Sequence, residues 1–161
     1  MNQTLVNDFN EIVTGRRSIR NYDPTVKISR QEMTEILTKA TLAPSSVNLQ
    51  PWRFVVIDSP EGKATLAPLA KFNQTQVATS AAMIAVFADM NSLDYADEIY
   101  GQAVDEGHMP AEVRDIQLPA IKGLISTMTP EQLKDMNLID SGLVSMQLML
   151  AARAHGYDTN P

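Results

Sequence analysis

Residues 43–57 read APSSVNLQPWRFVVI, and the two halves of this stretch predict different structures. Residues 52–57 are large and apolar apart from one arginine, and a turn signal follows them, which is typical of a buried strand. The preceding residues place serine, asparagine and glutamine between Pro44 and Pro51. Such a loop is stiffened by proline and carries neutral hydrogen-bonding groups, so it either contacts the edge of a heterocycle or forms ordinary turns.

Helical patterns lie on both sides of this strand. Apolar spacing supports the helices, and serine or threonine followed three residues later by Glu or Gln marks two of their starts. We expect helices from Leu5 to Gly15, from Ser29 to Pro44, from Glu61 to Ala70 and from Thr129 to His155, with a second strand from Met83 to Ala88.

The last predicted helix is apolar on nearly every side over residues 143–154. A helix of this kind is buried all round, either in the centre of a domain or at a subunit interface. Residues 91–128 fit a helical insertion, in which Pro119 should kink or split the helix. After Gly156 the chain looks like a loop leading to another element, so we expect a single domain over 1–161 that lacks its C-terminal segment.

The composition limits the classes of function. The chain has 161 residues and is 44% apolar, which suffices for one domain with a real core. A net charge of −6 and a pI near 4.8 argue against nucleic acid as a partner. No apolar run is long enough for a membrane span, no signal peptide is visible, and cysteine is absent. We therefore expect a cytoplasmic protein without nucleic-acid or membrane partners, and no metal site.

Three arginines lie within five residues of this acidic chain, at Arg16, Arg17 and Arg20. In an extended segment, Arg16, Ser18 and Arg20 lie on the same side. Two guanidinium groups and a hydroxyl on one side suit a phosphate, because arginine donates bidentate hydrogen bonds and keeps its charge. The alternative is a solvated charge run that pairs with neighbouring carboxylates.

Together these segments resemble the nitroreductase family of flavoproteins. The matching text is residues 16–22 and 43–54, with weaker matches at 73–76 and 154–161. The resemblance implies an α+β, nitroreductase-like three-layer fold in which a mixed, mainly antiparallel sheet is flanked by helices. It also implies an intertwined homodimer with FMN at the subunit interface. The resemblance does not extend to residues 91–128, which we interpret as a helical insertion over the site.

The resemblance assigns the basic segment to the cofactor. Arg16 and Ser18 would bind the FMN phosphate, and Arg17 would line the ribityl side. Arg20 would approach the pyrimidine edge of the flavin, where a fixed cation stabilises the reduced form.

Other parts of the site follow from the same resemblance. Ser45, Ser46 and Asn48 would come from the partner subunit, and Asn73 would hydrogen-bond the flavin ring with Gln76 nearby. No residue is expected to act as catalytic acid or base, because the flavin carries the chemistry. The full expected set of FMN-binding residues is Arg16, Arg17, Ser18, Arg20, Pro44, Ser45, Ser46, Asn48, Gln50, Asn73, Gln76 and Pro161.

The implied activity is FMN-dependent oxidation of NADH or NADPH by a ping-pong cycle, with a nitroaromatic, a quinone or another flavin as small-molecule electron acceptor. Specialised relatives remain open, among them a reductive dehalogenase, a flavin-fragmenting enzyme and an azoline dehydrogenase. A non-catalytic flavin-binding protein and an unrelated acidic α+β protein also remain open. We expect His155 to interact with a helix C-terminus and His108 to be a solvated loop residue.

Overall fold

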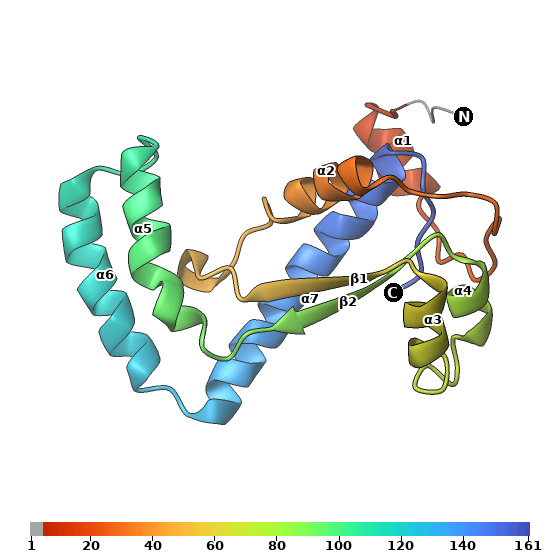
Figure 1. Cartoon of the computed structure of the whole chain (residues 1–161). Coiled ribbons are helices and arrows are strands. Elements are labelled where there is room, and N and C mark those ends of the chain that lie inside the picture. Colours follow the sequence, from red (N-terminus) through yellow and green to blue (C-terminus); the bar gives the residue numbers. More distant parts are fainter. Residues whose placement is uncertain (1–4) are drawn as a thin grey trace. The chain divides into compact units, whose positions relative to one another are not determined.

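The computed structural model describes residues 5–161, which form helices and a small sheet (Figure 1). Helices and strands are interspersed rather than in regular alternation, as expected for an α+β chain. The elements are α1 (Phe9–Gly15), α2 (Arg30–Ala40), η1 (Ser46–Asn48), β1 (Trp52–Ile57), α3 (Pro60–Leu66), α4 (Gln74–Thr79), β2 (Met83–Ala88), η2 (Ser92–Tyr95), α5 (Ala96–Asp105), α6 (Ala111–Ser126) and α7 (Pro130–Ala154).

Both predicted strands are confirmed at the predicted residues. β1 and β2 pair in a two-stranded sheet. The backbone N–H of Asp89, just after β2, donates to the carbonyl of Pro51, just before β1, at 2.7 Å. The start of β1 therefore faces the end of β2, and the pair is antiparallel.

The predicted start of α2 is confirmed, whereas α1 begins later than predicted. The Ser29 hydroxyl accepts from the Glu32 N–H at 3.1 Å and caps α2. In the first helix the Asp8 carboxylate accepts from the Glu11 N–H at 2.8 Å, so the cap lies at Asp8 and Leu5 precedes the helix. The apolar spacing before Asp8 suggested a longer helix because periodicity alone does not locate a cap.

Two other predicted helices are shorter than expected at their C-terminal ends. α2 ends at Ala40 rather than at Pro44, and α3 ends at Leu66 rather than at Ala70. In both cases a few turn residues continue the chain, as in the Ala43 N–H that donates to the Ala40 carbonyl at 3.0 Å. Sequence patterns seldom separate a final helical turn from a following tight turn.

The chain forms two compact units. The first consists of residues up to Ala43, Phe54–Val86 and Val144–Pro161, and the second consists of Pro44–Arg53 and Phe87–Leu143. In the second unit, Leu49, Ala96 and Ile125 form a buried cluster, against which side chains of α6 and the start of α7 pack. The predicted helical segment 91–128 therefore shares a core with the loop that precedes β1.

Of the predicted kink or split at Pro119, the split is wrong, and the kink stays a prediction. α6 runs from Ala111 to Ser126 with Pro119 inside it. Proline removes one backbone donor and crowds the carbonyl four residues earlier, which here belongs to Asp115. Both residues are exposed, so water can hydrate the carbonyl that loses its partner, and the rest of the helix keeps its hydrogen bonds.

The predicted start and end of α7 are confirmed. The Thr129 N–H donates to Gln132 Oε1 at 2.9 Å, and the Gln132 N–H donates to Thr129 Oγ1 at 3.3 Å, which is the reciprocal capping box. Gly156 follows the helix with φ of +84°, a left-handed conformation that glycine adopts without a steric cost.

Burial along the second half of α7 corrects one expectation. Val144 and Leu148 are buried, whereas Leu143 is 42% exposed and Met146 is 40% exposed. The helix is therefore not buried on every side within this chain, and the alternative of a position in a subunit interface stays a prediction. Within residues 5–161, no helix is both long enough and apolar enough to cross a membrane.

Candidate functional site

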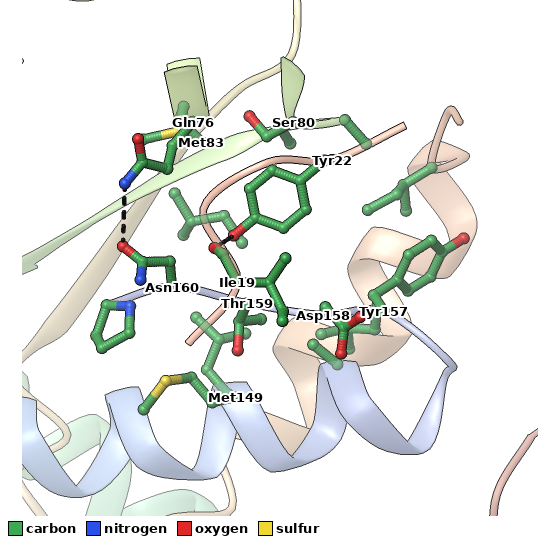
Figure 2. Close-up of a pocket in the computed structure, with 18 of the residues that line it drawn as sticks. Ile19, Tyr22, Gln76, Ser80, Met83, Met149, Tyr157, Asp158, Thr159 and Asn160 are labelled. Carbon is green, nitrogen blue, oxygen red and sulfur yellow. Dashed lines mark hydrogen bonds between the residues drawn. The ribbon is translucent and has the colours of Figure 1, made fainter. Parts of the chain in front are cut away.

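The first unit contains a cavity of about 630 Å³. Segments from five parts of the chain line it: the residues after α1, α2, the α4–β2 region, the last turns of α7 and the loop 156–161 (Figure 2). About half of the lining residues are aliphatic residues or methionines, including Met33, Met83 and Met149. Polar side chains gather at one part of the wall, which we call the amide corner and define as Asn73, Gln76 and Asn160.

The amide corner brings together residues that are distant in sequence. Gln76 is 7% exposed, and its Nε2 lies 3.2 Å from Asn73 Oδ1. The same nitrogen lies 3.4 Å from Asn160 Oδ1 (Figure 2). Pro161 lines the same cavity. Three of the predicted site residues, Asn73, Gln76 and Pro161, therefore meet at one cavity, and amide groups held in this way can hydrogen-bond both donors and acceptors of a ligand.

The basic segment runs beside the loop that follows α7. Ser18 forms a parallel bridge with Thr159, and the Ile19 N–H donates to the Thr159 carbonyl at 3.0 Å. Ile19 lines the cavity, whereas Ser18 and Arg20 are exposed and do not line it. This alternation agrees with the predicted extended segment.

The arginines of the basic segment lack acidic partners. Within residues 5–161, no ion pair involves Arg16, Arg17 or Arg20. Arg17 instead donates to the backbone carbonyls of Thr14 at 2.6 Å and of Arg16 at 2.7 Å. The alternative that these arginines pair with neighbouring carboxylates is therefore not what the structure shows, and their charges remain available to an external anion.

Tyr22 follows the basic segment and enters the cavity wall (Figure 2). Its hydroxyl donates to the Ile19 carbonyl at 2.7 Å, and its N–H donates to Thr79 Oγ1 at 3.1 Å. Burial, followed by the negative charge of Asp158, raises the pKa of Tyr22. The phenol therefore stays neutral and fixes the chain after the arginines.

The serine loop, defined as residues 44–50, belongs to the second unit. Val47, Asn48 and Gln50 have φ of 45°, 54° and 46°, which lie in the left-handed region. No residue of this loop lines the cavity of the first unit. The predicted site residues Pro44, Ser45, Ser46, Asn48 and Gln50 therefore lie together in the second unit.

Asp140 contacts the serine loop and was not predicted from the sequence. Asp140 in α7 is 1% exposed, and both of its carboxylate oxygens accept from the Ser46 N–H, at 3.0 and 3.1 Å. The Ser46 hydroxyl also donates to Asp140 Oδ1 at 3.1 Å. The only sequence signal was an acidic residue beside Leu138, Ile139 and Leu143 in a largely apolar stretch.

His155 was expected to interact with a helix C-terminus, and it does follow α7. It is also buried within a cluster of polar side chains. It lies just after α7 and is 2% exposed; its Nε2 lies 2.6 Å from Lys39 Nζ and its Nδ1 lies 3.5 Å from Glu32 Oε1. The Tyr157 hydroxyl donates to Glu32 Oε2 at 2.8 Å. Burial, and then the hydrogen bond and charge of Glu32, raise the pKa of Tyr157 to about 12. This cluster anchors the loop 156–161 to α2.

His108 is exposed after α5 and does not line the cavity, as predicted for a loop histidine.

Comparisons with known proteins identify the family. The profile described as "Nitroreductase family" matches residues 13–161. "Putative NAD(P)H nitroreductase YdgI" of Bacillus subtilis (strain 168) is 68% identical over 155 residues, which are 96% of this chain and 74% of that protein. "CLA biosynthesis enone reductase" of Lactiplantibacillus plantarum is 39% identical over 96% of this chain and 71% of its own length.

A solved structure gives the same result for the fold. It is that of "a putative nitroreductase in complex with FMN" from Exiguobacterium sibiricum 255-15, with a TM-score of 0.96 and 69% identity. The match covers all of this chain and 76% of that chain. These findings confirm the predicted α+β fold and the predicted resemblance: the chain belongs to the nitroreductase family.

Proposed function

We propose that this chain binds FMN and uses NADH or NADPH to reduce a small organic acceptor. The related structure in complex with FMN and the relatives named for NAD(P)H nitroreductase and enone reductase support a flavin oxidoreductase. The observation that carries the proposal is the group of three arginines without acidic partners, bridged to the loop that borders the amide corner. FMN consists of an anionic phosphate joined to a heterocyclic ring. The arginines fit the phosphate, and the amide corner fits the ring.

The basic segment would hold the phosphate. Arg16 and Ser18 are separated by one residue in an extended segment, so their side chains lie on the same side. Both can therefore reach one phosphate. Arg17 would line the ribityl chain. Because the guanidinium groups of Arg16, Arg17 and Arg20 form no ion pair within residues 5–161, no ion pair has to break before they bind an anion, although Arg17 also donates to two backbone carbonyls.

The amide corner would hold the edge of the flavin ring. Asn73 and Gln76 offer amide groups there, and Pro161 would pack along a ring face. Gln76 is neutral, so Arg20 would supply the positive charge that stabilises the reduced flavin. When bound, FMN supplies the centre that accepts hydride from the nicotinamide and passes the electrons to the acceptor in a ping-pong cycle.

The serine loop would complete the site from a second copy of the chain. We propose a homodimer in which Pro44, Ser45, Ser46, Asn48 and Gln50 of one subunit contact the FMN of the other. Apolar side chains on α7 that are exposed in the single chain, including Ile139 at 67%, support a subunit interface along this helix.

The acceptor would be a nitroaromatic, a quinone or another flavin. The enone reductase relative favours a second class of acceptor, an electron-poor carbon–carbon double bond conjugated to a carbonyl. Both classes can accept a hydride from reduced flavin without a strong acid or base on the protein. The cavity wall consists mainly of amides, hydroxyls and apolar groups, together with the carboxylates of Asp23 and Asp158.

An absorbance spectrum tests the proposal. The purified protein, supplied with FMN, should show the bands of bound flavin, and anaerobic NADPH or NADH should bleach them. Adding menadione or a nitroaromatic should then restore the bands. A protein that does not bind FMN contradicts the proposed cofactor, and bound flavin that neither nicotinamide bleaches contradicts the proposed activity.

A further inference from the structure

We propose that Asp140 fixes the polarity of the serine loop, so that the Ser46 hydroxyl can only accept a hydrogen bond from the bound flavin nucleotide while the Ser45 hydroxyl can donate one. Asp140 would thus be a positioning residue for cofactor recognition. This inference rests on the proposed binding of FMN by the serine loop. Asp140 itself lies outside that loop, 94 residues after Ser46 in the sequence.

The contacts of Asp140 determine where the Ser46 proton lies. Asp140 is 1% exposed and accepts from the Ser46 N–H and the Ser46 hydroxyl. A carboxylate only accepts hydrogen bonds, so the serine must donate. Within residues 5–161, Asp140 has no cationic partner, and these contacts with Ser46 are its hydrogen bonds. The hydroxyl proton of Ser46 is therefore donated to Asp140, and only the lone pairs of its oxygen remain, as acceptors, for a ligand.

Ser45 has the opposite arrangement. Its Oγ accepts from the Gln50 N–H at 3.0 Å, and among the hydrogen bonds of residues 5–161 this hydroxyl donates none. Its proton is thus available to a ligand. Both serines are half-buried, so each retains surface that a ligand can contact. Two adjacent side chains of the same type consequently present different groups.

The backbone around these serines is held rather than free. Val47 is β-branched and has φ of 45°, a conformation that costs energy and persists only where surrounding contacts impose it. The Tyr100 hydroxyl donates to the Val47 carbonyl at 3.0 Å, and Leu49 is 1% exposed in the core of the second unit. The link from Ser46 to Asp140 is the third of these contacts. A loop fixed in this way keeps each hydroxyl in one place.

This polarity selects which atoms of FMN can contact Ser46. Phosphate oxygens of the dianion accept hydrogen bonds, so they do not pair with a serine that has no proton to give. The ribityl hydroxyls and the ring N3–H are donors, and they fit Ser46. Ser45 fits an acceptor, such as a flavin carbonyl or a phosphate oxygen.

The test replaces Asp140 by its uncharged isostere. Asp140→Asn keeps one acceptor and gains an NH2 donor. With the amide oxygen in the place of Oδ2 it still accepts from the Ser46 N–H, while the amide nitrogen in the place of Oδ1 donates to the Ser46 oxygen and the serine proton turns outward. FMN affinity, measured by quenching of flavin fluorescence, should fall about tenfold because two donors then face each other. Asp135→Asn, at an exposed site on the same helix, should bind FMN as the unchanged protein does.

A double-mutant comparison separates this role from general support of the loop. Ser46→Ala alone should weaken FMN binding several-fold, and adding Asp140→Asn to it should change the affinity less than twofold. An equal loss from Asp140→Asn in both backgrounds would overturn the inference. Ser46→Ala that binds FMN as tightly as the unchanged protein would also overturn it, whether or not Asp140→Asn folds.

Lumiflavin identifies the donor. It keeps N3–H but lacks the ribityl chain and the phosphate, so equal weakening of lumiflavin and FMN by Asp140→Asn assigns the ring N–H, and weakening of FMN alone assigns a ribityl hydroxyl. If the unchanged protein binds no FMN, the proposed function fails. If it binds FMN and Asp140→Asn binds it equally well, only the role of Asp140 fails.

Discussion

The basic segment of residues 16–20 and the serine loop of residues 44–50 are both polar, but they are built in opposite ways. The basic segment is mostly exposed, and none of its arginines forms an ion pair within residues 5–161. In the serine loop, both serine hydroxyls already hydrogen-bond within the chain, and three residues have positive φ. One region offers free charge, and the other offers fixed hydrogen-bonding groups.

This difference between free charge and fixed hydrogen-bonding groups determines how each region can recognise a ligand. Charge acts over a long range and tolerates small errors in position, whereas a neutral hydrogen bond is lost when its geometry changes by a few tenths of an ångström. Substitutions in the basic segment should therefore lower ligand affinity with little loss of stability. Substitutions that loosen the serine loop should lower both.

The largest expected effect is on the anchor of the serine loop. Leu49→Ala should lower the free energy of unfolding by about 2–5 kcal/mol, because it leaves a cavity in the core of the second unit where Leu49 is 1% exposed. Urea denaturation measures this. Leu42→Ala, at a site that is 74% exposed, should change it by about 0.5 kcal/mol or less. Equal stabilities of the two variants would mean that the loop is not held by its core contact.

The next effect is on the basic segment. Arg16→Ala should weaken FMN binding by about 1.5–3 kcal/mol, the loss expected for a charge-assisted contact, while the melting temperature stays close to that of the unchanged protein. Titration calorimetry gives the affinity. Arg30→Ala, an exposed arginine at the start of α2, is the matched control and should leave FMN binding unchanged. Unaltered affinity in Arg16→Ala would show that Arg16 points away from the phosphate.

A smaller effect is expected on the redox potential. Arg20→Ala should lower the two-electron potential of the bound flavin by about 30 mV, which corresponds to about 1.4 kcal/mol, and should slow its reduction by NADPH. A potential measured with reference dyes decides this. An unchanged potential would contradict the role of Arg20 and would leave the amide corner, where Gln76 is neutral, without a cation at the flavin edge.

The smallest effect concerns the anchor of the loop 156–161. Tyr157 has a pKa near 12 in the folded chain against 10.0 for the ordinary phenol, so its contribution is present below pH 10 and is lost as the pH rises toward 12. Tyr157→Phe should remove this part of the alkaline loss of stability and cost about 1 kcal/mol at neutral pH. Thermal melts across pH 8–12 measure both, with Tyr95→Phe as control because Tyr95 is 44% exposed and its hydroxyl forms no hydrogen bond within residues 5–161. The account of this anchor fails if both variants lose stability equally with rising pH.

Local features of the fold were predictable, and distant contacts were not. The strands at 52–57 and 83–88 follow from apolar runs, the first of which ends in a turn signal, and the box of Thr129 and Gln132 follows from capping chemistry. Whether the helix would continue through Pro119 was left open between a kink and a split, because its tolerance depends on solvent reaching the Asp115 carbonyl. That dependence is a property of the folded surface.

The candidate site shows the same division. Asn73, Gln76 and Pro161 were expected at one ligand, and they do line one cavity. Asp140 was not expected, because its role depends on the pairing of one acidic side chain with a loop far away in sequence. Neither spacing nor composition indicates that partner, whereas three arginines within five residues are evident from the order of residues alone.

The most direct test of the central claim is a crystal structure of the protein grown with FMN. The account predicts a phosphate within about 3 Å of the guanidinium nitrogens of Arg16 and of the Ser18 hydroxyl, with the ring edge at Asn73. Density that places the phosphate elsewhere, with these arginines facing only solvent, would contradict it.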